Sequence, residues 1–241
     1  MNKEELVKKI EEIDEQIAEI SYDGRSAIFD GIVDVDRYLA ADLKIMWILK
    51  EVNSLNDEGE WSLTKDILLN LKDDSTTSGI KSGWDKTLPP VIYVTHGLLN
   101  QKIWKEIPDL TDDNSIADTL QDIAFINLKK VSGIGKSNDK EIKSYLKEYS
   151  SIIEKQINGY QPNVIICGGT GDFIDDILDE ILGNYVEKNI ENNIKFFFYK
   201  DVVLVYAYHP NLVVSYRKKD QETYCDTIIK NVLAWKGKYI K

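Results

Sequence analysis

The most restrictive feature of this chain is a pattern that occurs three times: a short apolar run followed at once by a polar segment. Runs of about 4–8 apolar residues are typical of strands buried in a parallel sheet. In an open parallel α/β sheet, ligands bind in the crevice beyond the carboxyl ends of the strands. We therefore expect the three polar segments to converge on one site. They are residues 50–53, 127–130 and 209–211, and they follow the runs 45–49, 123–126 and 202–208.

The alternation of strand and helix patterns predicts an α/β fold, a three-layer α/β/α sandwich with a central, mostly parallel four-stranded sheet. No internal repeat or domain boundary is visible, so we expect a single α/β domain over residues 1–241. Within it, a helical N-terminal extension (1–43) precedes a core (44–235). The expected helices are 4–20, 36–44, 63–72, 139–158, 172–182 and 220–235, and the expected strands are 44–50, 122–127, 163–167 and a hairpin of 194–199 with 202–208.

Composition narrows the function classes. The net charge is −11, from 30 basic and 41 acidic residues, which argues against a broad nucleic-acid-binding surface. No apolar run approaches the roughly 20 residues of a membrane helix, and the N-terminus is charged and helical in pattern, so we expect a cytoplasmic protein with no membrane contact. With two cysteines and two histidines, we expect no metal site and no cofactor.

The polar segments contain side chains suited to acid–base and hydrogen-bonding chemistry. His209, in the segment with Asn211, could stabilise negative charge that develops on a ligand oxygen. Asn127 offers donors and an acceptor in one plane, which suits the amide-like edge of a pyrimidine. Glu51 could activate a water as general base, and Asn53 could hold that water. Ordinary loop roles remain open for each: a solvated charge, a turn or a backbone contact.

Two further features have both a functional and a plain interpretation. The turn that begins at Gly168 could cradle a phosphate at a helix N-terminus, although tight helix–strand packing is the more frequent role of such glycines. Lys129, Lys130 and Lys136, with the basic residues 217–219, could give an acidic protein a local basic rim beside the site. Solvated charge runs are the alternative. Three tryptophans could stack on bases, and the sequence does not choose among Trp61, Trp84 and Trp104.

The order and spacing of these segments resemble the uracil-DNA glycosylase superfamily, over roughly residues 44–235. ILKEVNS stands where that family has a strand followed by G-Q-D-P-Y, G-E-A-P-G or G-I-N-P-G; FINLKK stands at its base-binding asparagine, and YHPNLVVSYRKK at its HPS-type loop. The resemblance implies that Asn127 reads the edge of a uracil and that His209 stabilises the departing base. It also implies that Leu212 or Val213 wedges into the gap that a flipped base leaves.

The resemblance implies hydrolysis of an N-glycosidic bond without a cofactor, on a deaminated base, with DNA as the expected partner. The sequence departs from the family at Lys50, where a glycine is usual, and at Val52, in the slot of the water-activating Asp or Asn. Val52 favours a second interpretation, a non-catalytic member that binds nucleotide or nucleic acid. The acidic composition favours a third, a nucleoside-type small-molecule hydrolase or transferase with a nucleobase or nucleoside ligand.

Overall fold

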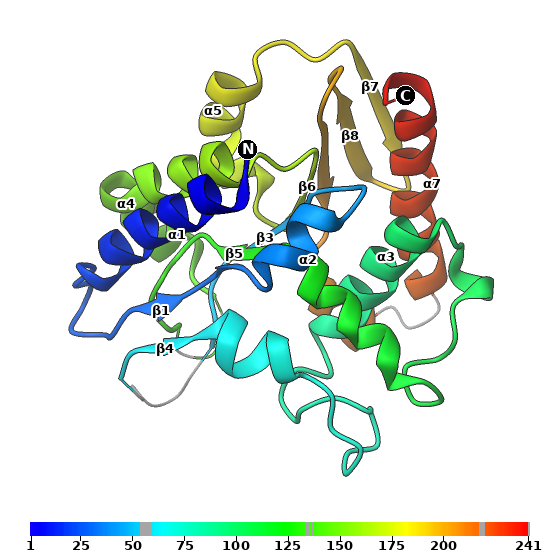
Figure 1. Cartoon of the computed structure of the whole chain (residues 1–241), viewed down its shortest axis with the longest axis horizontal. Helices are drawn as coiled ribbons and strands as arrows, with labels where there is room; N and C mark the ends of the chain where they lie inside the picture. Colours follow the sequence, from blue (N-terminus) through cyan, green and yellow to red (C-terminus); the bar gives the residue numbers. More distant parts are fainter. Residues whose placement is uncertain (54–58, 134, 136, 217–219, 241) are drawn as a thin grey trace.

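The computed structural model of the protein describes residues 1–53, 59–133, 135, 137–216 and 220–240. A seven-stranded mixed sheet lies between two layers of helices (Figure 1), with strand order β2-β5-β3-β6-β9-β8-β7. The four central strands, β5, β3, β6 and β9, are mutually parallel. The strands of this sheet are β2 (Gly31–Ile32), β3 (Ile45–Leu49), β5 (Ala124–Asn127), β6 (Val164–Gly168), β7 (Glu187–Glu191), β8 (Ile194–Phe198) and β9 (Val203–Ala207).

Strand β3 forms the middle of the parallel core because all five of its residues are apolar and buried. Side chains alternate between the two faces of a strand. Accordingly, Trp47 packs with the helices on one face of the sheet, whereas Met46 and Ile48 pack with the helices on the other. A strand buried on both faces requires helix layers on both sides.

One helix layer consists of α1, α4 and α5, whose apolar stripes pack on one face of the sheet. The other contains α3, α7 and the 3₁₀ helix η4. The helices are α1 (Lys3–Ala18), α2 (Val35–Ala40), α3 (Leu88–Asn100), α4 (Asp139–Tyr160), α5 (Gly171–Leu182), α6 (Pro210–Tyr216), α7 (Gln221–Tyr239), the π-helix η1 (Leu63–Ile67), and the 3₁₀ helices η2 (Leu68–Asn70), η3 (Trp104–Glu106) and η4 (Asn114–Asp122).

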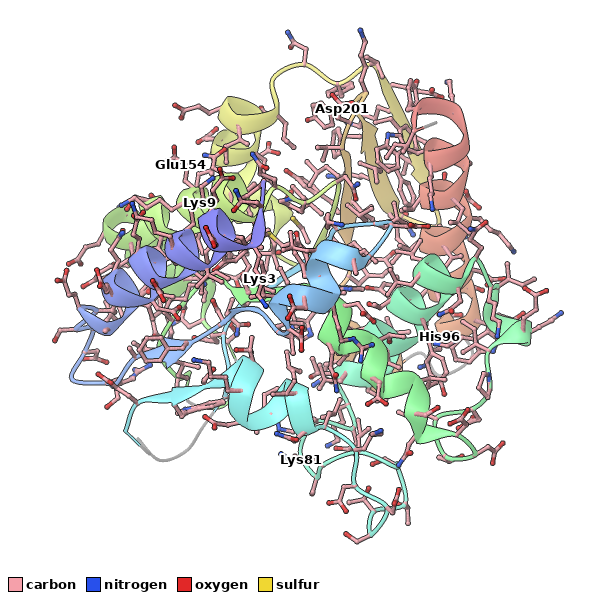
Figure 2. All side chains as sticks on the ribbon, viewed as in Figure 1. Lys3, Lys9, Lys81, His96, Glu154 and Asp201 are labelled. Carbon is pink, nitrogen blue, oxygen red and sulfur yellow. The ribbon has the colours of Figure 1, made fainter. Side chains whose placement is uncertain are left out.

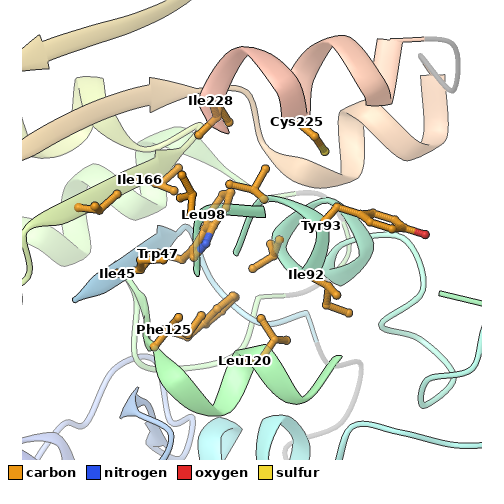
Figure 3. Close-up of a cluster of buried hydrophobic side chains, with 14 of the residues drawn as sticks. Ile45, Trp47, Ile92, Tyr93, Leu98, Leu120, Phe125, Ile166, Cys225 and Ile228 are labelled. Carbon is orange, nitrogen blue, oxygen red and sulfur yellow. The ribbon is translucent and has the colours of Figure 1, made fainter. Parts of the chain in front are cut away.

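Figure 3 shows the core between the sheet and this second layer. Trp47 and Phe125 from the central strands meet Leu98 of α3, Leu120 of η4 and Ile228 of α7. The indole N–H of Trp47 donates to the hydroxyl of Thr95, at 3.2 Å, inside this core. This hydrogen bond ties α3 to the central strand β3.

The predicted parallel core is present, but the sheet is larger than the four strands expected. The predicted hairpin of 194–199 with 202–208 is confirmed by the antiparallel pair β8–β9. The strands that were not predicted are β2, antiparallel to β5, and β7, antiparallel to β8. Strand β7 is mostly exposed, and β2 has only two residues, so neither has the apolar run or alternation that marks a strand in sequence. The N-terminal segment is therefore not only helical: it supplies β2 and also β1 (Ile28–Phe29), which pairs with β4 (Trp61–Ser62).

The segment 63–72 was predicted as one α-helix and instead forms the π-helix η1 followed by the 3₁₀ helix η2. The predicted cap is correct, since the Ser62 hydroxyl accepts from the backbone N–H of Lys65 at 3.2 Å. Across the described residues, no helix combines the length and the apolar character that a membrane crossing demands.

Candidate functional site

A cavity of about 290 Å³ opens beyond the carboxyl ends of β3, β5 and β9. Leu49 and Asn127 are the last residues of neighbouring parallel strands and pair with each other in register, so the segments after them meet at this edge. Five of the predicted site residues line the cavity. Its lining is Leu49, Glu51, Val52, Asn53, Leu63, Gly83, Trp84, Lys86, Thr87, Phe125, Asn127, His209 and Asn211.

His209 lies between the end of β9 and the start of α6, and its ring is fixed by its own loop. The backbone N–H of Asn211 donates to His209 Nδ1 at 3.2 Å. A neutral imidazole that accepts at Nδ1 carries its proton on Nε2. Burial, and secondarily the charge of Lys50, lowers the pKa of His209 to about 4. At neutral pH the ring is therefore uncharged and presents an Nε2–H donor at the cavity that it lines.

Asn127 is 3% exposed at the end of β5. Its backbone N–H donates to Asp30 Oδ2 at 2.7 Å. Within the described residues its side-chain amide has no hydrogen-bond partner. Its amide atoms are not among the fully buried polar atoms that lack a partner, so the amide is accessible from the cavity that Asn127 lines, and a ligand there could bond to it. The arrangement suits recognition of an adjacent donor and acceptor on a planar ligand.

Glu51 lines the same cavity, but its carboxylate is engaged inside the protein. Its side chain is 3% exposed and forms an ion pair with the fully buried Lys129. The Ser137 hydroxyl donates to Glu51 Oε1 at 2.7 Å, and Gly133 packs so closely that a Cβ there would lie 2.5 Å from Glu51 Cδ. The expected role as general base conflicts with this geometry, because Lys129 and Ser137 already occupy the carboxylate that would have to bind the water.

The expected basic rim is wrong for the two lysines that the structure describes. Lys129 is buried between Glu51 and Glu141. Lys130 is buried against Asp30, with Nζ 2.7 Å from Asp30 Oδ1, so it does not reach a substrate in the cavity. Both ammonium groups can be buried because a carboxylate from a distant segment of the chain neutralises each of them. Residues 136 and 217–219, the rest of the expected rim, lie outside the described residues.

Gly168 does not line the cavity. Its role is the tight packing that was the alternative to phosphate binding. A Cβ on Gly168 would lie 2.4 Å from Leu49 Cδ2 and 3.1 Å from Pro210 Cδ. Gly169 has φ +74° and lies against the backbone of His209, in the left-handed region that favours glycine. The two glycines thus allow β6 to turn away while the loop that contains His209 packs directly on it.

The remaining predicted residues differ in exposure. Asn53 is exposed, and it forms a bridge with Gly133 while lining the cavity. Leu212 follows His209 in the first turn of α6 and is 49% exposed, although it does not line the cavity. Val213 is 2% exposed and belongs to the core.

Two aromatic residues that line the cavity were not assigned to it from the sequence. Phe125 lines it from β5, two residues before Asn127 on the same face of the strand, a spacing that could have identified it. Of the three tryptophans considered, Trp84 lines the cavity, whereas Trp104 packs on Tyr93 with ring centroids 4.5 Å apart. Trp61 lies in strand β4.

Among the described residues, no three His, Cys, Asp or Glu side chains gather closely enough to hold a metal ion. Cys167 and Cys225 are both free and buried. No protein-family model matches the chain, and no curated protein matches it. The functional assignment therefore depends on the cavity itself.

Proposed function

We propose that the cavity binds a uracil-type nucleobase and that the protein hydrolyses the N-glycosidic bond of that base, in a fold related to the uracil-DNA glycosylases. The observation that carries this proposal is the pairing of two oriented groups in one cavity. Asn127 offers a side-chain amide with no hydrogen-bond partner among the described residues, and His209 offers a neutral Nε2–H donor. A ligand that satisfies both has adjacent donor and acceptor atoms on one edge and a carbonyl oxygen on another.

A uracil ring has this pattern. Its N3–H and neighbouring O4 match the amide oxygen and nitrogen of Asn127, and its O2 faces a donor such as His209 Nε2–H. Phe125 and Trp84 are aromatic residues in the cavity lining on which the ring could stack, and base–aromatic stacking contributes about 1–3 kcal/mol. A cavity of about 290 Å³ accommodates one pyrimidine together with water.

In the proposed reaction the bond between the sugar C1′ and the base N1 breaks, and its electron pair moves onto the base. The negative charge spreads to O2, where the Nε2–H of His209 stabilises it. Water then adds its oxygen to C1′, and its proton goes to the departing base. Asn53, at the open side of the cavity, is the side chain that orients this water. The carboxylate in the cavity lining belongs to Glu51, which is paired with Lys129. Most of the rate enhancement therefore comes from stabilisation of the departing base and not from activation of the water.

A second function is favoured by a specific observation: the protein binds the base without cutting. Val52 contributes an apolar side chain where a water-activating group would stand, and Glu51 is held by Lys129. In this case the cavity would select the same base, but the glycosidic bond would persist.

The decisive experiment is an assay for abasic sites. The protein is incubated with single- and double-stranded oligonucleotides that contain uracil, hypoxanthine or xanthine, and with the free nucleosides in parallel. We expect cleavage at uracil that is about a hundredfold to a thousandfold slower in His209→Ala and unchanged in His96→Ala. Binding of uracil-containing strands without cleavage supports the second function. Release of base from nucleosides alone identifies a small-molecule enzyme, and neither binding nor cleavage rejects the proposal.

A further inference from the structure

The polar network behind Asn127 is built from segments far apart in sequence. Asp30 accepts two hydrogen bonds from Lys130 Nζ, at 2.7 and 2.9 Å. Gln156 of α4 donates to Asp30 Oδ1 at 2.9 Å and accepts from Lys130 Nζ at 2.7 Å. We call Asp30, Lys130 and Gln156 the Asp30 network. The side chains of Asp30 and Lys130 are 1% and 0% exposed, so no part of it serves the protein surface.

The Asp30 network acts on Asn127 through one hydrogen bond. The ladder between β2 and β5 pairs Gly31 with Phe125 and Ile32 with Ala124. Past this point the carboxylate of Asp30 takes the place of a neighbouring strand, and its Oδ2 accepts from the backbone N–H of Asn127 at 2.7 Å. On the other flank Asn127 pairs in register with Leu49 of β3. The backbone of Asn127 is therefore held on both sides.

The chain adopts a special backbone conformation to bring Asp30 inward. Gly31 has φ +143°, and a Cβ there would lie 2.7 Å from Tyr160 Oη. Only glycine fits both the torsion angle and the close approach. The bend at Asp30 that separates β1 from β2 thus depends on the absence of a side chain at Gly31.

Stability alone gives a weak reason to keep such a network. Replacing a buried ion pair by well-packed apolar residues is often neutral or stabilising, because burial of two charges is costly. A charge-assisted hydrogen bond, in contrast, is short and strongly directional. Asp30 makes such a bond to the backbone of Asn127, whose side-chain amide lines the cavity.

We propose that the Asp30 network is a positioning device that fixes the backbone of Asn127 and so aims its amide at the edge of the bound base. Asp30, Lys130 and Gln156 are positioning residues, and none of them contacts the ligand. The inference depends on the proposed function for its effect on base selection. Its first step, the restraint of Asn127, is independent of that function.

The test compares two charge-free versions of the network. Asp30→Asn with Lys130→Met keeps an amide oxygen that can accept from the Asn127 N–H. Asp30→Leu with Lys130→Met and Gln156→Leu removes every acceptor and fills the space with apolar atoms. Asp122→Asn weakens the Arg37–Asp122 pair at 2.8 Å, just before β5, and Asp122 makes no bond to the Asn127 backbone N–H, which donates to Asp30. It therefore controls for loss of an ion pair as such in the same stretch of chain.

Two quantities are measured: amide hydrogen exchange at Asn127 relative to Ile126, and the ratio of binding constants for oligonucleotides with uracil or cytosine at one position. We expect the apolar version to speed Asn127 exchange about tenfold and to lower the base ratio about tenfold, since one charge-assisted hydrogen bond is lost. The amide version and Asp122→Asn should stay within about twofold. Urea denaturation verifies that each variant is folded.

If the apolar version does not fold, Gln156→Leu alone loosens Asp30, and about threefold faster exchange at Asn127 is expected for a partly weakened bond. Unchanged exchange and unchanged base ratio in folded variants would overturn the positioning role while leaving the proposed function intact. If the wild-type protein shows no preference between uracil and cytosine, the proposed function fails, and the exchange measurement alone still decides whether the network restrains Asn127.

Discussion

Two cavities in this molecule each contain one of its two histidines, and they differ in how the polar groups are arranged. The larger, about 520 Å³, lies between α2, α3 and η4 and is lined by His96, which Figure 2 labels on the α3 side of the molecule. The smaller, about 290 Å³, contains His209 at the carboxyl edge of the sheet. The proposed site is the smaller of the two, so the proposal does not follow from volume.

The difference lies in orientation. Both imidazole nitrogens of His96 are buried and lack a partner within the described chain. Two charged residues that line the same cavity, Arg37 and Asp122, are already paired with each other by two hydrogen bonds. Burial lowers the pKa of His96, as it does for His209. Of the two, only His209 has its ring fixed by a hydrogen bond from a backbone N–H, and it shares its cavity with the Asn127 amide, for which no hydrogen bond within the described residues is found. A perturbed pKa therefore gains functional meaning from the geometry around it.

The largest expected effect separates the two histidines directly. His209→Ala should lower the single-turnover rate on uracil-containing strands about a hundredfold to a thousandfold, since the lost donor contributes about 3–4 kcal/mol to the transition state. His96→Ala should change it by less than about twofold. The rates are measured with enzyme in excess over labelled oligonucleotide. Equal losses in both variants would contradict the assignment of the site.

The second effect concerns stability against pH. The folded-state pKa of His209 is lowered from 6.5 to about 4. The unfolded chain therefore binds a proton at His209 more tightly than the folded protein does. The contribution of the neutral ring to the free energy of unfolding is fully present above pH 6.5 and is lost as the pH falls through about 4. The loss is on the order of 2–3 kcal/mol. Urea unfolding at pH 7 and pH 4 should show a smaller decline for His209→Gln than for wild type. Identical declines would show that His209 titrates normally.

The third effect tests base recognition. Asn127→Ala should lower the preference for uracil over cytosine by about 1–3 kcal/mol, roughly tenfold to a hundredfold, because the edge contacts of the base lose their partner. Asn100→Ala is the matched control, since Asn100 lines the larger cavity and bonds only the backbone carbonyl of His96, at 2.9 Å. Relative binding constants are measured by competition. A loss of affinity equal for both bases would argue against edge reading by Asn127.

The smallest expected effect is a gain in cleavage rate when a carboxylate is added to the smaller cavity. Val52→Asp places a carboxylate beside Asn53, where it can accept a proton from water. We expect a rise in cleavage rate of about tenfold, less than the 10²–10⁴ of an evolved general base. Val52→Leu has a side chain of similar size that can neither bind water nor accept a proton, and it should show no rise. If wild type and both variants are inactive on every deaminated base, the non-catalytic function is the better description.

The sequence by itself determined which strands form the parallel core and which polar residues follow them. Apolar runs such as residues 45–49 have one stable location, the middle of a sheet covered on both faces, and the carboxyl ends of parallel strands share an edge. Glu51, Asn53, Asn127 and His209 were therefore predicted to meet, and all four line one cavity.

Only the tertiary structure decided what these residues do there. Lys129 and Lys130 are adjacent in sequence and resemble a basic rim, but each is buried by a carboxylate that no local pattern connects to it, Glu51 for one and Asp30 for the other. The pairing of charges across 78 or 100 positions is set by packing. Sequence periodicity reports which face of an element is buried, whereas the partner that a buried charge finds depends on how distant elements come together.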